Sequence, residues 1–265
     1  MQKTVGTYGK SISMTTLLAK AQAKLSDASN TKLGRLIHGW SIPAGRDKTC
    51  PGASVLCHGR CYARSGFFRM PNVRSVHDRN YDFSLTDQFE DWMRAVVVTN
   101  FVQIMRIHVS GDFYDLAYTQ KWFRILSQLP RTRFFAYTRS WRDESIFPEL
   151  VKIAGLSNVS LWFSIDRETG PAPLVRGVRR AYMAISDVDA ENAPDDCDLV
   201  FRDDPVTIMK KANGVQVCPP ENGVTTQFKI TCSHCGICWN KQQTQWETDL
   251  LPLLDTSEIN APEDF

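Results

Sequence analysis

The chain lacks any long apolar run and any secretory leader. None of its 265 residues belongs to a stretch near the roughly 18 apolar residues that a membrane-spanning helix needs. The first 24 residues carry four lysines and no apolar core, which is not the pattern of a signal peptide. We therefore expect a cytoplasmic protein that does not contact a membrane.

The sequence also lacks several common catalytic motifs. It contains no P-loop, no G-x-S-x-G, no H-E-x-x-H and no glycine-rich dinucleotide fingerprint. Nucleotide hydrolysis, serine hydrolase chemistry and classical zinc proteolysis therefore have no support.

Net charge is low but unevenly placed. The chain carries a net charge of +2, yet residues 241–265 hold one basic residue against six acidic ones. The rest of the chain is therefore moderately basic. Such a balance excludes a polycation and permits an anionic partner, such as a nucleic acid or a nucleotide.

Apolar stretches alternate with segments of helical spacing along most of the chain. Strands are expected at residues 36–40, 106–112, 133–140, 159–166, 181–187 and 199–203. Helices are expected at residues 12–28, 84–101, 116–129, 144–154 and 173–180. This alternation predicts an α/β fold with a parallel sheet, and we favour a full or partial (β/α) barrel over a doubly wound sheet.

Most of the expected strands end in a polar residue. These ends are Asp112, Ser140, Asp166, Asp187 and Asp203. In β/α barrels the carboxyl ends of the strands form the active face. The alternative is that these side chains only start loops or cap helices.

Four regions follow from these patterns. We expect an N-terminal helical extension at residues 1–30 and the barrel at residues 31–210, with a cysteine-bearing loop at residues 50–61. A cysteine-rich, metal-binding segment follows at residues 211–240, and an acidic tail at residues 241–265.

The eight cysteines are clustered rather than spread. Clustered cysteines in a cytosolic protein usually bind metal or react, because cytosolic thiols stay reduced. Cys50, Cys57 and Cys61 give the spacing C-x6-C-x3-C. Three thiolates suit a [4Fe–4S] cluster with one open iron, and zinc with His58 as a fourth ligand is the alternative.

Residues around this loop resemble the radical S-adenosylmethionine (radical SAM) enzymes. The likeness rests on Cys-Tyr-Ala at residues 61–63, on the position of the loop behind the first strand, and on Ser-Gly-Asp at residues 110–112. Residues 50–80 and 106–112 look even more like a phage- and plasmid-encoded family named for a phage gene product, gene product 88. The commonest radical SAM spacing is C-x3-C-x2-C, from which this loop differs.

The resemblance implies a radical SAM-type barrel and roles for particular residues. Cys50, Cys57 and Cys61 would hold the cluster, whose open iron would bind S-adenosylmethionine (SAM). The implied cofactor-binding residues are Tyr62, Ser110, Gly111, Asp112, Ser164 and Asp166. An electron donor would be needed, and a 5′-deoxyadenosyl radical would act on the substrate.

A second cysteine group lies near the end of the barrel region. Cys232, Cys235 and Cys238 form C-x2-C-x2-C, and Cys218 precedes a proline. This set is similar to the ligand run of bacterial ferredoxins, which predicts a second [4Fe–4S] cluster. A structural zinc ion is the alternative, with His234 available. The remaining Cys197 is expected to be a small buried hydrophobe.

Basic residues gather near aromatic ones. Arginines surround or follow the first cysteine loop at positions 60, 64, 69, 74 and 79. Arg139 and Arg142 flank Trp141 and would bind an anionic substrate if they lie at the barrel mouth. For any single arginine, a solvated face is the simpler interpretation.

Two functions are consistent with these features. The first is a radical SAM-like iron–sulfur enzyme acting on a substrate that could be a nucleotide or nucleic acid. The alternative is a catalytically inert, metal-stabilised phage or plasmid accessory protein that binds nucleic acid or a host factor.

Overall fold

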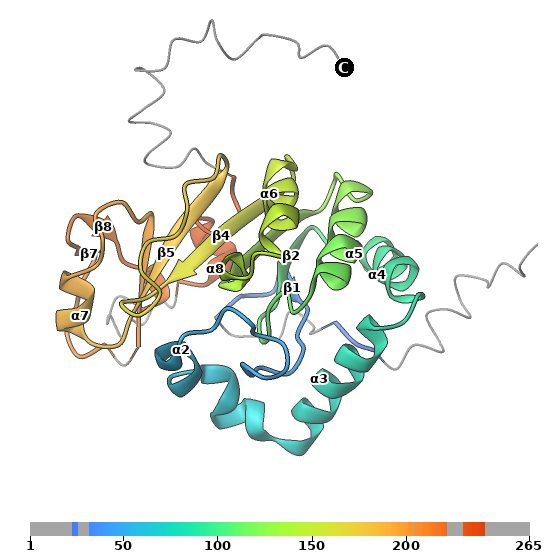
Figure 1. Cartoon of the computed structure of the whole chain (residues 1–265), viewed down its shortest axis with the longest axis horizontal. Coiled ribbons are helices and arrows are strands. Elements are labelled where there is room, and N and C mark those ends of the chain that lie inside the picture. The colour runs from blue at the N-terminus through green and yellow to red at the C-terminus, as the bar shows by residue number, and fades with distance from the viewer. Residues whose placement is uncertain (1–22, 26–31, 204, 222–229, 242–265) are drawn as a thin grey trace, which may run out of the picture.

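A computed structural model of the chain describes residues 23–25, 32–203, 205–221 and 230–241. At its centre is one six-stranded parallel sheet (Figure 1). Its strands are β1 (Ile37–Gly39), β2 (Ile104–Ile107), β3 (Arg133–Thr138), β4 (Val159–Ile165), β5 (Val178–Ala184) and β6 (Leu199–Arg202), and they lie in chain order. A doubly wound sheet would reverse its order at a switch point.

The unbroken strand order is that of a half-barrel, which confirms the expected partial barrel. Among the described residues, β1 pairs with β2, while β6 pairs with β5 and makes one isolated parallel bridge to Val217. No described strand joins β6 to β1, so the barrel stays open. A small antiparallel pair follows, β7 (Lys211–Ala212) with β8 (Val215–Gln216).

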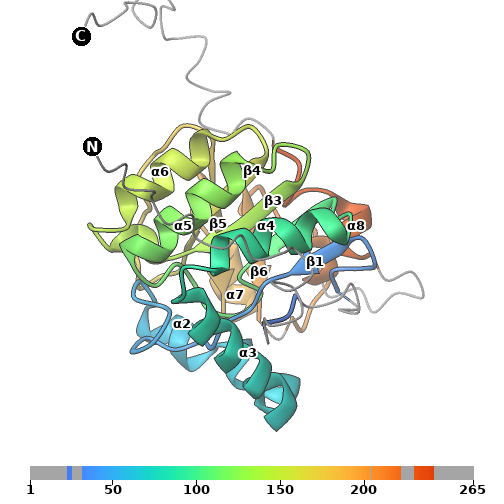
Figure 2. The same ribbon diagram turned by 90° about the vertical axis from the view of Figure 1, so that its right-hand side faces the viewer.

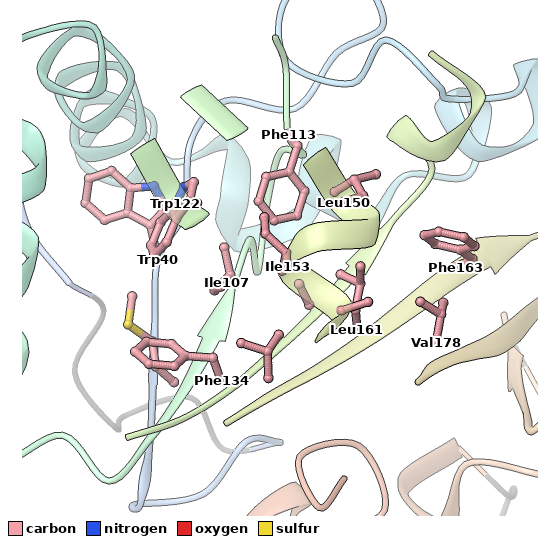
Figure 3. Packing of buried hydrophobic residues seen from close by; sticks show 14 of the residues in the cluster. Trp40, Ile107, Phe113, Trp122, Phe134, Leu150, Ile153, Leu161, Phe163 and Val178 are labelled. Atoms are coloured by element: carbon pink, nitrogen blue, oxygen red, sulfur yellow. The ribbon is translucent and has the colours of Figure 1, made fainter. Parts of the chain in front are cut away.

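Three helices cover the outer face of the sheet. They are α4 (Phe89–Thr99), α5 (Leu116–Ser127) and α6 (Phe147–Gly155), which lie side by side in Figure 2. Alternate strand residues point toward them, since side chains alternate between the faces of a strand. Figure 3 shows Ile107, Phe134, Leu161 and Phe163 among Trp122, Leu150 and Ile153. No helix in the described part of the chain is long and apolar enough to cross a membrane.

The other strand residues form a second, inner core. This core contains Ile37, Ile104, Phe135, Trp162, Ala181 and Leu199. Cys218 and Cys238 are buried in the same cluster. The cysteine-rich segment (residues 211–240) therefore covers the inner face, whereas α4, α5 and α6 cover the outer one.

Some predicted elements are wrong in place or type. Residues 173–180 do not form a helix, because Gly177 takes a φ of 76° within the segment and β5 begins at Val178. The helix expected over residues 84–101 begins at Phe89, since α3 (Pro71–Ser84) occupies the residues before it. The helix expected over residues 12–28 falls outside the described residues, apart from residues 23–25, which are not helical.

The strand expected over residues 106–112 ends at Ile107. His108 has a φ of 61°, in the left-handed region that breaks a strand. Its ring is buried, and Nε2 shares a hydrogen bond of 2.9 Å with the hydroxyl of Tyr118 on α5. His108 is thus an interior histidine whose Nε2 is hydrogen-bonded, whereas its buried Nδ1 has no hydrogen-bond partner among the described residues. Burial, reinforced by Arg106, lowers the pKa of His108 to about 3.

Acid should destabilise the fold through this histidine. The unfolded chain takes up the His108 proton below about pH 6.5, whereas the folded chain resists it, so stability falls as the pH falls. Between pH 7 and 4 the loss attributable to His108 is about 3 kcal/mol. Urea unfolding of the wild type and of His108→Asn, which tolerates positive φ, measures this loss as the difference between the two pH profiles. Parallel profiles would contradict it.

Candidate functional site

The first cysteine group lies on the connection from β1 to β2. Residues 50–61, the cysteine loop, contain the short helix α2 (Val55–Gly59), which the sequence did not predict. Ser54 caps this helix by accepting a hydrogen bond of 2.9 Å from the amide of Cys57. Cys61 begins the 3-10 helix η1 (Tyr62–Arg64). Each of the three cysteines therefore has a backbone position fixed by local structure.

The cysteine loop is clamped to the carboxyl ends of β3 and β4. Ser54 donates to Asp166 at 2.6 Å, and Arg139 forms a buried salt bridge with the same carboxylate. Arg142 donates to the carbonyl of Gly52 at 2.9 Å. The amide of Leu56 donates to Glu168, just beyond β4, at 2.8 Å. The loop is therefore held at the edge where β/α barrels carry their active sites. These contacts between the cysteine loop and the ends of β3 and β4 are here called the clamp.

Close packing reinforces the clamp at one glycine. A Cβ atom on Gly52 would lie 1.8 Å from the carbonyl oxygen of Arg139, which is far inside van der Waals contact. Only a residue without a side chain lets the two backbones approach this closely.

Asp112 lies at the same edge, beyond β2. Its carboxylate accepts hydrogen bonds of 2.8 Å from the amides of Phe113 and Arg139. Burial raises its pKa to about 6, although these hydrogen bonds favour the charged form. Asp112 thus holds the backbone of Arg139, and Asp166 holds its side chain, so the two carboxylates together fix the turn that follows β3.

The three cysteines of the loop are half-buried free thiols. Burial, together with Asp112, raises the pKa of Cys50 to about 12. Burial also raises the pKa of Cys57 and Cys61, whereas the charge of Arg139 lowers both. Among the described residues, no three His, Cys, Asp or Glu side chains are grouped as ligands of a metal ion.

The residues expected to bind SAM lie at this edge but differ in their exposure and in their hydrogen bonds. The Tyr62 hydroxyl donates to the carbonyl of Val109, and its ring packs against Phe68. Ser110 is buried, and its hydroxyl has no hydrogen-bond partner in the described part of the chain. Gly111 has a φ of 84° and packs closely on Ile42.

Ser164 on β4 and Asp166 just after it, both expected to bind SAM, differ in how far the protein already occupies their hydrogen-bonding groups. Ser164 is half-buried at the end of β4, and its carbonyl accepts from the indole of Trp141. Asp166 accepts hydrogen bonds from Ser54, Arg139 and the amides of Glu168 and Thr169. Both oxygens of Asp166 are therefore already engaged by the protein.

Arg139 and Arg142, the expected anion-binding pair, both serve the clamp. The Arg139 side chain is 6% exposed and faces Asp166. Arg142 is exposed, although its Nη1 donates to the carbonyl of Gly52. Gly52, Ser54 and Glu168 were missed from the sequence. A serine three residues before Cys57 is a helix-cap signal, but a helix of five residues is too short to be predicted from periodicity.

The second cysteine group gathers on the inner face of the sheet. Cys218 follows β8, and Cys232 and Cys235 bound the short helix α8 (Cys232–Cys235). Cys218 and Cys238 are buried, whereas the other two are half-buried. The four lie within electrostatic reach, since Cys232 raises the pKa of Cys218 and of Cys238, and Cys235 that of Cys232, each adding to the larger effect of burial. Cys197 is buried in the outer core, as expected.

Comparison with known proteins identifies relatives of the whole folded region. The family described as Gene product 88 matches residues 16–241. The Gene 88 protein of Mycobacterium phage D29 is 25% identical over 77% of this chain and 83% of its own. The Gene 88 protein of Mycobacterium phage L5 is 26% identical over 75% of this chain and 81% of its own. No solved structure matches the chain.

Replacing Gly52 with alanine should detach the cysteine loop from β3. The new methyl group would collide with the Arg139 carbonyl, and such overpacking typically costs about 1–3 kcal/mol. Gly59→Ala in the same loop is the matched control, because nothing lies within 4 Å of its added Cβ. Thermal unfolding and the rate at which a thiol reagent labels Cys57 report the change. Equal behaviour of the two variants would contradict the clamp.

Proposed function

The chain belongs to the Gene product 88 family, and we propose that it is an iron–sulfur enzyme of radical SAM type. One observation carries the proposal. Three half-buried thiols of a single loop are fixed at the carboxyl edge of an open parallel half-barrel, beside Asp112 and the Arg139–Asp166 pair. That edge is where β/α barrels place their chemistry.

The residues present fit an iron–sulfur cluster. Cysteine thiolates are soft ligands that suit such clusters, and three of them leave one iron free for a further ligand. A four-iron cluster carries each cysteine on a different iron, so its sulfurs stand farther apart than around one ion. Cys50, Cys57 and Cys61 would hold the cluster.

The arginines beside the loop favour the thiolate forms that such a cluster needs, whereas Asp112 and Asp166 oppose the thiolate form of Cys57. Cysteines must lose their protons to bind metal. Arg139 lowers the pKa of Cys57 and Cys61, and Arg64 lowers that of Cys61, in opposition to the larger effect of burial. Asp112 acts in the opposite sense on Cys50, whose pKa is raised first by burial.

When bound, such a cluster passes one electron from an external low-potential donor to SAM and breaks a carbon–sulfur bond, giving methionine and a 5′-deoxyadenosyl radical that removes a hydrogen atom from the substrate. The chain's own residues orient SAM and exclude water. In the proposal, Ser110 offers its unpartnered hydroxyl, and Asp112 accepts from the SAM amino group through a lone pair that its two backbone hydrogen bonds leave free. Gly111 packs on Ile42 and turns the backbone at positive φ between these two residues. Tyr62 packs beside the loop, and Ser164 binds the ribose, because Asp166 is engaged in the clamp.

Formation of 5′-deoxyadenosine tests the proposal. The full chain is purified without oxygen, loaded with ferrous iron and sulfide, and incubated with SAM and dithionite. The wild type should release 5′-deoxyadenosine, and the triple variant Cys50→Ser, Cys57→Ser, Cys61→Ser should fall to background. Cys197→Ser, a buried cysteine outside both groups, should match the wild type. Iron-loaded wild type that leaves SAM intact would refute the radical mechanism.

A second candidate function, nucleic-acid binding, rests on the segment at residues 60–79, here called the basic arm. It runs through η1, the 3-10 helix η2 (Gly66–Arg69) and the first part of α3, along one edge of the molecule (Figures 1 and 2). It carries five arginines against one acid, Asp78. Phe67 is 77% exposed among them. Exposed aromatics between arginines suit base stacking with phosphate contacts.

Three of the five arginines of the arm are available to an anion, whereas Arg60 pairs with Asp203. Arg69, Arg74 and Arg79 line one shallow groove, together with Asp78 and Asp82. None of these three arginines forms a salt bridge with a described residue, and Asp78 pairs with Lys48 instead.

Fluorescence anisotropy with a labelled single-stranded oligothymidine tests this surface. Phe67→Asn should weaken binding by about tenfold, which corresponds to one lost stacking contact. Phe101→Asn is the matched control, because Phe101 is equally exposed but lies outside the arm. Arg69→Gln and Arg74→Gln should reduce the salt dependence. Equal affinities of the two phenylalanine variants, or affinity independent of salt, would count against the arm.

A further inference from the structure

The arginines of the sheet divide into two classes by their partners. Three buried ones pair with carboxylates: Arg139 with Asp166, Arg180 with Asp196 and Arg202 with Asp187. Within the described residues, Arg106 on β2 and Arg179 on β5 form no salt bridge. Both of these lie against the cysteine-rich segment.

Arg106 is surrounded by tyrosines and cysteines. Its Nη2 donates to the Tyr62 hydroxyl at 3.3 Å, and its guanidinium lies 5.5 Å from the centre of the Tyr137 ring. Its Nε is buried without a hydrogen-bond partner among the described residues. Burial by itself lowers the pKa of Arg106, but Tyr62, Tyr137, Cys232 and Cys238 together raise it. The guanidinium is thus charged and faces the thiols of the cysteine-rich segment.

Arg179 is even less exposed, at 4%. Its guanidinium lies 3.8 Å from the centre of the Trp162 ring, and it donates to Ser160 at 2.6 Å and to the carbonyl of Asn240 at 2.9 Å. Burial lowers its pKa in spite of Tyr137, Cys238 and Asp198, which favour the charged form. A buried cation with only neutral hydrogen-bond partners costs several kcal/mol.

In the described part of the chain, neither neighbouring carboxylate is hydrogen-bonded to these two guanidinium groups. Asp198 favours the charged form of Arg179 from nearby, and its Oδ2 accepts a hydrogen bond of 2.8 Å from the amide of Arg180. Glu221 pairs with Lys32 and accepts from the backbone of Arg202. The inner face therefore holds, beside four cysteines, two guanidinium groups that form no salt bridge with a described carboxylate.

We propose that Cys218, Cys232, Cys235 and Cys238 bind a [4Fe–4S] cluster, and that Arg106 and Arg179 compensate its charge. Four thiolates around an oxidised cluster carry a net charge of about −2, which matches the two unpaired guanidinium groups. Assembly releases four thiol protons and forms four sulfur–iron bonds, with no net oxidation of the protein. This centre is independent of the cluster proposed for the cysteine loop.

The local backbone suits a cluster. Three cysteines, with two residues between each and the next, lie on α8 and the turn after it. In this turn Gly236 takes a φ of 78° and reverses the chain. This is the arrangement of the ferredoxin ligand run.

The segment is anchored in advance at both ends. The amides of Cys232 and Ser233 donate to the carbonyls of Lys32 and Leu33 at 2.9 and 3.0 Å. The Trp162 indole donates to the carbonyl of Cys238 at 3.0 Å. Ligands held by such contacts pay little ordering cost when the cluster binds.

Composition of a variant without the other cluster site is the first test. In the triple variant Cys50→Ser, Cys57→Ser, Cys61→Ser, anaerobic loading should leave about four iron and about four sulfide per chain. Adding Cys235→Ser and Cys238→Ser should remove both. Zinc without sulfide, or no metal, would overturn the proposal. Because the three thiols of the cysteine loop are replaced in this variant, the result does not depend on SAM cleavage.

The charge argument has its own test in the same triple variant. Arg106→Met should lower the Tm of the loaded chain and raise that of the metal-free chain, since the cation stabilises the loaded form and destabilises the metal-free form. Arg180→Met is the matched control and should lower both, because its partner is the Asp196 carboxylate. Arg106→Lys should restore the loaded Tm. Where the metal-free chain does not fold, Arg106→Met should lose iron to a chelator faster than Arg180→Met. Arg106→Met acting alike on both forms, or losing iron no faster than Arg180→Met, would overturn the proposal.

Discussion

Asp166 accepts hydrogen bonds from both sides of the candidate site, and the position of the cysteine loop depends on it. Ser54 brings the loop to one carboxylate oxygen, and Arg139 brings the turn after β3 to the same oxygen. The pair is buried, so loss of either partner would leave an uncompensated charge, a change that typically costs about 3–5 kcal/mol. The clamp therefore couples a segment near the start of the chain to two strands in the middle of the sheet.

The same physical rule separates the two cysteine groups. At the carboxyl edge, the buried guanidinium of Arg139 finds a carboxylate, and its charge is shared with nearby thiols. On the inner face, Arg106 and Arg179 meet aromatic rings and thiols instead. Low dielectric makes an unpaired charge expensive, and so the missing counter-charge is itself information about what the face is built to hold.

The sequence predicted the half-barrel well because buried parallel strands read as continuous apolar runs, as in β3 and β4. It misplaced the end of β2, since the positive φ of His108 depends on its tertiary contact with Tyr118 rather than on local preference. The cysteines were visible as motifs. The clamp was not, because Ser54 and Asp166 are 112 residues apart and nothing local marks them as partners. Asp166 was foreseen at the edge, but as a ligand-binding group.

The anchoring of the cysteine-rich segment on Lys32 and Leu33 has a consequence for the order of folding. These contacts join positions about two hundred residues apart, and closing so long a loop carries a large entropic cost that must be met before the contact is rewarded. During synthesis from the N-terminus, the helix-covered side of the sheet is complete while the inner apolar side still lacks its cover. A half-barrel made only as far as β6 would therefore expose its apolar inner face until Cys218 and residues 230–241 pack on it.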